Sequence, residues 1–201
     1  MHTSPAPTTG LLLAAGAGTR LGRGPKALLP FRGRTLVEAL AGELRAGGCA
    51  EVTVVLGAGA EEVRRLPGLH DCNLVENPRW RNGMGGSLQV GLASTPADHH
   101  VLVALVDQPG VGAAIVERLL GAHRPGRVTA AGYRGRDGEL RRGHPLVLDA
   151  SLKRAAAESA TGDAGARDFL RAHPELIDVV DCSDLGSDDD VDTAEDLHHL
   201  D

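Results

Sequence analysis

Short apolar runs alternate along the chain with longer stretches in which apolar residues recur at helical spacing. The apolar runs predict strands at Gly10–Ala15, Glu51–Gly57, Cys72–Asn77, His100–Asp107, Arg127–Tyr133, His144–Asp149 and Leu176–Asp181. Such alternation is typical of parallel strands joined by helical crossovers. We therefore predict an α/β protein, a three-layer α/β/α sandwich with a mostly parallel, Rossmann-like sheet and an antiparallel excursion between Tyr133 and Leu148.

The predicted helices lie between these strands. From Thr35 to Gly48 the chain has a threonine suited to the N-cap, Glu38 three residues later and a glycine stop, which together are typical of a capping-box helix. The stretch Gly112–His123 and the segments after Ser151 and Asp163 also have helical spacing.

The chain length of 201 residues suits one domain, and no repeat or linker divides it. We expect a disordered tail over residues 1–9 and a single domain over residues 10–201. Aromatic residues are only 2% of the chain and the net charge is −6, which disfavours a nucleic-acid groove.

The three cysteines, Cys49, Cys72 and Cys182, are widely spaced and lack a C-x-x-C pair, so they indicate neither a disulfide framework nor a zinc site. The N-terminal segment is polar, and the apolar stretch after it is too short to span a bilayer. We expect a cytoplasmic protein with no membrane partner.

A glycine-rich loop follows the first predicted strand. Its glycines, Gly16, Gly18 and Gly22, have the spacing G-x-G-x-x-x-G, one residue longer than the dinucleotide fingerprint, and Pro25 interrupts the helix that should follow. No G-K-[ST] motif is present either. Backbone N–H groups and nearby cationic side chains suit a polyphosphate. The alternative is an ordinary βα turn with surface arginines.

Ligands of open α/β sheets bind outside the carboxyl ends of the strands. The glycine loop follows the first predicted strand, Asn77–Trp80 follows the third, and Asp107–Pro109 follows the fourth. We expect these three segments to meet at one edge of the sheet.

The stretch Leu11–Lys26 resembles the L-A-A-G-x-G-x-R-x-G-x-x-K signature of the MobA-like nucleotidyltransferases, especially the molybdenum cofactor cytidylyltransferases. The resemblance continues through Asn77–Leu88, Leu105–Val111, Gly143–Pro145, Gly162–Arg167 and Asp190–Leu197. It implies a nucleotidyltransferase fold for the whole domain.

The resemblance also implies a nucleotide site. Its predicted contacts are Leu13, Ala14, Ala15, Gly16, Gly18, Arg20, Lys26, Gly83, Ser87 and Asp107. Lys26, Arg20 and Asp107 would be the catalytic residues, because lysine and arginine can hold the charge that moves onto the leaving pyrophosphate. Leu13–Gly16 looks closer to the cytidylyl than to the guanylyl branch, which favours CTP.

In the family, an aspartate corresponding to Asp107 binds Mg²⁺. The acidic run near the C-terminus, Ser187–Asp196, points to Asp192, with Asp190 behind it, as a further ligand. Ala194 stands where the family usually has proline, so the choice between Asp190 and Asp192 stays open. The alternative is structural: Asp107 caps a turn, and the acidic run is a solvated helix start.

On the acceptor side the resemblance points to His144, Asp163 and Arg167, each of which could equally be structural. Trp80 is interpreted as a packing anchor in preference to a base-stacking ring.

The function implied by the resemblance is transfer of a nucleoside monophosphate, CMP from CTP, to a phosphate-bearing acceptor, with molybdopterin favoured. A molybdoenzyme or a chaperone would receive the product. Three alternatives stay open: a MobA-like transferase with another NTP or acceptor, a nicotinamide-dependent oxidoreductase, and a nonenzymatic cofactor carrier. The glycine spacing disfavours the oxidoreductase, as does the lack of an acid closing the second strand.

Overall fold

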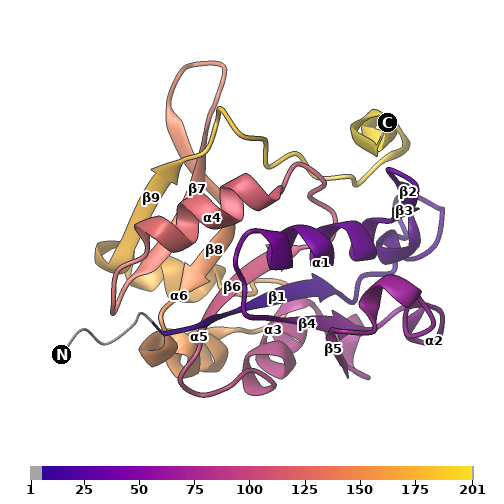
Figure 1. The fold of residues 1–201 in the computed structure, drawn as a ribbon, viewed down its shortest axis with the longest axis horizontal. Coiled ribbons are helices and arrows are strands. Elements are labelled where there is room, and N and C mark those ends of the chain that lie inside the picture. Colours follow the sequence, from indigo (N-terminus) through magenta and orange to yellow (C-terminus); the bar gives the residue numbers. More distant parts are fainter. Residues whose placement is uncertain (1–5, 201) are drawn as a thin grey trace.

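A computed structural model describes residues 6–200 of the chain, which form a seven-stranded sheet between two layers of helices (Figure 1). The sheet order is β5-β4-β1-β6-β8-β7-β9, and only β8 runs antiparallel to its neighbours. The strands are β1 (Thr8–Ala14), β4 (Glu51–Leu56), β5 (Asn73–Glu76), β6 (His100–Leu105), β7 (Val128–Arg134), β8 (Leu140–Leu148) and β9 (Ile177–Asp181). A small hairpin is formed by β2 (Pro30–Phe31) and β3 (Arg34–Thr35).

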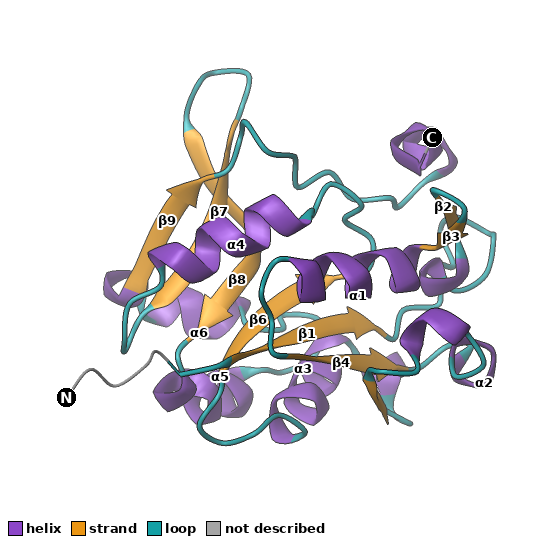
Figure 2. Ribbon diagram, viewed as in Figure 1, coloured by secondary structure: helices purple, strands orange, loops and turns teal. Residues whose placement is uncertain are grey.

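The helices cover both faces of the sheet (Figure 2). They are α1 (Leu36–Ala46), α2 (Ala60–Val63), α3 (Met84–Ala93), α4 (Ala113–Ala122), α5 (Lys153–Ser159) and α6 (Arg167–Ala172). Helices α1 and α4 pack on one face, and α3, α5 and α6 pack on the other. The predicted three-layer α/β/α sandwich with a mostly parallel sheet is therefore confirmed.

Alternation along β1 explains the layers. Leu12 and Ala14 point into the core beneath α1 and α4, whereas Leu11 and Leu13 point into the core above α3, α5 and α6. A strand that is buried on both faces has a continuous apolar sequence, as the central strands of this chain do. None of the helices within residues 6–200 is long and apolar enough to cross a bilayer.

All seven predicted strands are present, and the antiparallel excursion is β8. The predicted tail is too long, because Thr8 and Thr9 belong to β1 and are buried. The Thr9 hydroxyl donates to Glu51 Oε1 at 3.0 Å, which satisfies a polar group inside the sheet. Residues 1–5 of the predicted tail lie outside the described residues.

The capping box at the start of α1 is confirmed. Glu38 Oε2 accepts hydrogen bonds from the backbone N–H and the hydroxyl of Thr35, at 3.0 and 2.7 Å. The other carboxylate oxygen accepts from Gly68 N at 2.9 Å. Burial would raise the pKa of Glu38, but these hydrogen bonds outweigh it and lower the pKa below its ordinary value.

Helix α3 lies very close to the sheet at Gly91. A Cβ atom added there would lie 2.6 Å from Leu11 Cδ1 and 2.9 Å from Val55 Cγ2, both in the core of the sheet. The helix can approach β1 and β4 this closely only because Gly91 has no side chain. This contact fixes the distance between α3 and the carboxyl ends of those strands.

We expect Gly91→Ala to destabilise the protein. Overpacking a core typically costs about 1–3 kcal/mol, which exceeds the roughly 1 kcal/mol gained when alanine replaces glycine in a helix. Gly121→Ala is the matched control, because nothing lies within 4 Å of a Cβ atom at that position of α4. Urea unfolding should show a lower free energy of unfolding for Gly91→Ala and an equal or higher one for Gly121→Ala; equal gains in both would contradict the close packing.

Candidate active site

A cavity of about 820 Å³ opens at the carboxyl ends of the central parallel strands. The glycine loop after β1 and Asp107 after β6 line it, together with three acidic residues from the C-terminal segment: Asp188, Asp190 and Asp192. A second cavity of about 290 Å³ shares Gly16, Lys26 and Asp107 with the first and also contacts Trp80. The three segments expected at one edge of the sheet do meet there.

Lys26 occupies the centre of the site. Its ammonium donates to Asp107 Oδ2 at 2.8 Å and to Asp192 Oδ1, and only 12% of its side chain is exposed. Burial opposes the charge on Lys26, but hydrogen bonds and attraction from the two carboxylates outweigh it and raise its pKa. The residue is therefore an ammonium at physiological pH.

The glycine loop directs Lys26 into the cavity. Gly18 has a φ of 62°, and a Cβ atom there would lie 2.4 Å from the carbonyl oxygen of Gly24 and 3.2 Å from Cγ of Lys26. Since the loop folds back on itself at this point, only glycine fits. The turn is closed by hydrogen bonds from Leu21 N and Gly22 N to Gly18 O.

A backbone hydrogen bond brings the acidic segment to the cavity. Val191 N donates to Asp107 O at 2.8 Å, which places Asp190 and Asp192 on either side of this contact. Asp192 faces Lys26, and Arg20 lies 3.9 Å from its other carboxylate oxygen. The structure thus brings the basic loop and the acidic run together.

Asp190 has different surroundings from Asp192. Its Oδ1 accepts from Gln108 Nε2 at 2.9 Å. Burial, together with repulsion from Asp107 and Asp192, raises the pKa of Asp190. Asp107 and Asp192 reach one ammonium from two sides, so this pair is the better placed to share a divalent cation, with Asp190 behind it.

The smaller cavity lies beside the start of α3. Leu13, Ala15, Gly83 and Ser87 line it. The Ser87 hydroxyl accepts from Asn77 Nδ2 at 3.0 Å, a fully buried hydrogen bond between α3 and the loop after β5.

Trp80 is a packing residue that also faces the smaller cavity. Its Cγ would lie 2.7 Å from a Cβ atom at Gly57, so the indole packs directly on the backbone after β4. The Arg81 guanidinium carbon lies 4.4 Å from the centroid of the indole ring.

The large cavity also contacts the residues expected on the acceptor side, His144, Asp163 and Arg167. Gly85 N donates to Gly162 O at 2.7 Å, which joins the start of α3 to the loop carrying Asp163. Burial lowers the pKa of His144 to about 4, although Asp107 acts in the opposite direction, so the imidazole is neutral at physiological pH. Its hydrogen-bonding nitrogens can orient an acceptor without adding charge.

A family model described as "MobA-like NTP transferase domain" matches residues 10–177. This chain belongs to the MobA-like NTP transferase family.

Among its relatives, nicotine blue oxidoreductase of Paenarthrobacter nicotinovorans is 54% identical over 194 residues, covering 96% of this chain and 95% of that protein. The manganese complex of Rv0371C from Mycobacterium tuberculosis H37Rv is 27% identical with a TM-score of 0.77, over 97% of this chain and 98% of the other. A nucleotidyl transferase from Methanothermobacter is 24% identical with a TM-score of 0.79, over 96% and 95% of the two chains, and shares the fold.

Most of the residues that the resemblance assigned to this MobA-like site line the two cavities. Ala14 is the exception, because its side chain is buried in the core beneath α1 and α4. Sequence analysis missed Gln108, Arg142 and Asp188, which also line the large cavity. Gln108 directly follows Asp107, and Arg142 directly precedes the Gly143–Pro145 segment. Asp188 belongs to the acidic run, so sequence proximity could have found all three.

We expect His144 to stay neutral down to about pH 4, its folded-state pKa. The unfolded chain takes up this proton near pH 6.5. Because the unfolded state binds the proton first, His144 should reduce stability as pH falls from about 6.5 to 4 and have no such effect above that range. Urea unfolding of the wild type and His144→Gln across this range checks the difference, and NMR titration gives the pKa; an ordinary pKa near 6.5 would refute it.

Proposed function

We propose that this MobA-like protein transfers a nucleoside monophosphate from a nucleoside triphosphate to a phosphate-bearing acceptor and releases pyrophosphate. The observation that carries the proposal is the position of Lys26 between Asp107 and Asp192, at the mouth of the glycine loop. This arrangement combines a phosphate-binding cation with two carboxylates suited to Mg²⁺. CTP and molybdopterin are the substrates we favour.

When bound, Mg²⁺ held by Asp107 and Asp192 would neutralise charge on the triphosphate oxygens. If both carboxylates held the cation, the Lys26 ammonium, which pairs with them in this structure, would be available to donate to phosphate oxygens. Arg20 is 82% exposed at the rim and can reach the same group with its planar guanidinium. The backbone N–H groups of the glycine loop add uncharged donors.

The acceptor needs no protein base. A phosphate monoester has its second pKa near ~6, so it is largely a dianion at neutral pH and is already a nucleophile. Arg142 and Arg167 line the large cavity and offer the positive charge that would hold this dianion. Catalysis then depends on alignment and on stabilisation of the leaving pyrophosphate.

The smaller cavity is suited to the nucleoside. Its wall combines Leu13 and Trp80 with Ser87, and it opens beside the glycine loop where the phosphates would bind. The Leu13–Gly16 sequence favours cytosine as the base. A cytoplasmic location, and delivery of the product to a molybdoenzyme or a chaperone, stay predictions.

We expect pyrophosphate release from CTP in the presence of Mg²⁺ and molybdopterin, and its loss in EDTA. Asp107→Asn and Lys26→Met should each lower the rate by about 10²–10³-fold, the effect typical of removing one preorganised charge-stabilising group. Asp181→Asn is the control, since this carboxylate is on β9, where it pairs with Arg134. Activity surviving both site substitutions would contradict the assignment, and thermal protection by GTP but not CTP would contradict the choice of nucleotide.

A second candidate is an oxidoreductase, favoured by the 54% identity to nicotine blue oxidoreductase over nearly the whole chain. A nicotinamide dinucleotide could place its pyrophosphate at the glycine loop. Against this, Gly57 follows β4, so no carboxylate stands where dinucleotide-binding folds bind the ribose hydroxyls.

Nucleotidyl transfer would need the Asp107 and Asp192 carboxylates to hold Mg²⁺, whereas the oxidoreductase reaction would not. Oxidation of NADPH or NADH should be followed spectrophotometrically with nicotine blue or a quinone dye as acceptor, in EDTA and without NTP. We expect no turnover above a protein-free control. Turnover in EDTA that persists in Asp192→Asn would favour the oxidoreductase and overturn nucleotidyl transfer as the main activity.

A further inference from the structure

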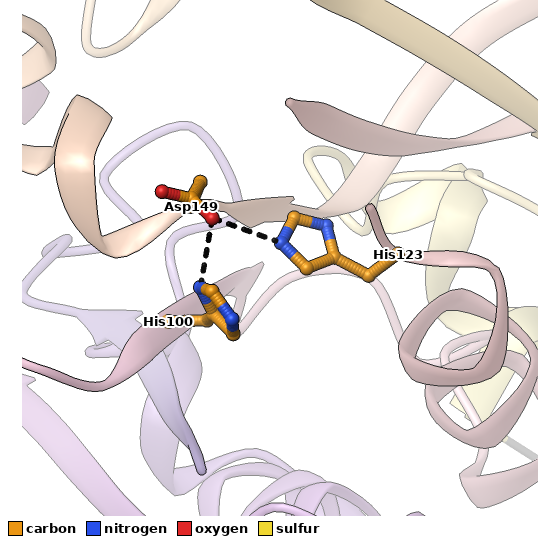
Figure 3. Close-up of side chains that lie close together, drawn as sticks. All are labelled: His100, His123 and Asp149. Carbon is orange, nitrogen blue, oxygen red and sulfur yellow. Dashed lines mark ion pairs between the residues drawn. The ribbon is translucent and has the colours of Figure 1, made fainter. Parts of the chain in front are cut away.

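A second cluster of metal-ligating side chains lies at the opposite edge of the sheet from the active site. His100 is the first residue of β6, His123 follows α4, and Asp149 follows β8 (Figure 3). Strand β6 separates His100 from Leu105 by five residues, or roughly 17 Å at about 3.3 Å per residue, and Asp107 follows beyond its far end. The cluster is therefore separate from the proposed nucleotidyl-transfer site.

The three side chains direct ligand atoms at one point. His100 Nδ1 and His123 Nε2 lie 3.3 and 3.8 Å from the same oxygen, Asp149 Oδ2. One potential ligand atom from each of the three side chains lies within 4.8 Å of the other two. Two ligands of a tetrahedral Zn²⁺, each at 2.0–2.2 Å, are about 3.3–3.6 Å apart, so this spacing is close to that of a metal site.

Hydrogen bonds on the outer side hold two of the three side chains in place. His123 Nδ1 is hydrogen-bonded to the Thr129 hydroxyl at 2.9 Å, and Asp149 Oδ1 accepts from the backbone and hydroxyl of Ser151 at 2.9 and 2.5 Å. Such outer partners are what fix the orientation of histidine and carboxylate ligands around metals.

The decisive atom is Nε2 of His123. The side chain is only 6% exposed, and Nε2 has no hydrogen-bond partner within residues 6–200. A buried polar atom without a partner is costly, and a bound ion would satisfy it. His100 Nδ1 does have a partner, since it accepts from Ala150 N at 3.1 Å, and binding would exchange that bond for coordination.

We propose that His100, His123 and Asp149 bind a tetrahedral divalent cation of the Zn²⁺ class, with water as the fourth ligand. Two imidazoles and one carboxylate are a donor set typical of zinc, whereas Mg²⁺ prefers oxygen alone. The site joins the ends of α4, β6 and β8, so its ion would hold these three elements together.

Untagged protein carrying Asp107→Asn and Asp192→Asn, which remove the active-site carboxylates, should be stripped with chelator, loaded with Zn²⁺ and desalted. We expect about one zinc per chain by atomic emission, a higher melting temperature with zinc, and the intense visible bands of tetrahedral Co²⁺ when cobalt replaces it. Absence of retained zinc would overturn the proposal.

His123→Gln should abolish zinc retention, and Thr129→Val should weaken binding by about 10–100-fold, as loss of an outer partner typically does. His173→Gln is the matched control, because His173 pairs with the Glu175 carboxylate on the surface, at 3.4 Å. Circular dichroism confirms folding; if His123→Gln fails to fold, Thr129→Val decides. Zinc binding that is unchanged in Thr129→Val, or weakened equally in His173→Gln, would overturn the assignment.

Discussion

The ion pairs of Lys26 with Asp107 and Asp192 join three segments that are far apart in the sequence, and the geometry of the active site depends on them. Removing either carboxylate would leave the largely buried Lys26 ammonium with one anionic partner fewer, and an incompletely paired buried charge destabilises a protein. The backbone bond from Val191 to Asp107 supports the same arrangement without charge. The acidic segment is thereby held at the sheet edge by a contact that does not depend on charge.

The sheet could be predicted from the sequence because strands that are buried on both faces have continuous apolar runs. In the helices of this chain the apolar residues recur at helical spacing instead. Helix α3 could not, since Met84–Ala93 contains three glycines, and its helical form depends on packing of Gly91 against Leu11. The early start of β8 was missed because Leu140–Arg142 is exposed on both sides of the strand. Its pairing with β7 therefore produces no alternation of buried and exposed residues that the sequence could show.

The sequence could predict those residues of the active site that directly follow the end of a strand. The family resemblance supplied Asp192 and Lys26, which the topology then brings together. The cluster of His100, His123 and Asp149 had no local signature, because its members lie more than twenty residues apart and meet only through the antiparallel course of β8. The family is described as one of NTP transferases, whereas one relative is named an oxidoreductase. Such a difference is expected where one fold supports many kinds of site.

The reversed direction of β8 has a mechanical consequence. This strand carries His144 toward the active site and delivers Asp149 to the other edge of the sheet, and it is paired on both sides, to β6 and β7. A one-residue slip would turn every side chain to the opposite face, so two ladders together prevent it. His144 and Asp149 are five residues apart in the sequence, or roughly 17 Å, and the doubly paired residues Leu146–Leu148 between them hold the two ends of the sheet at this spacing.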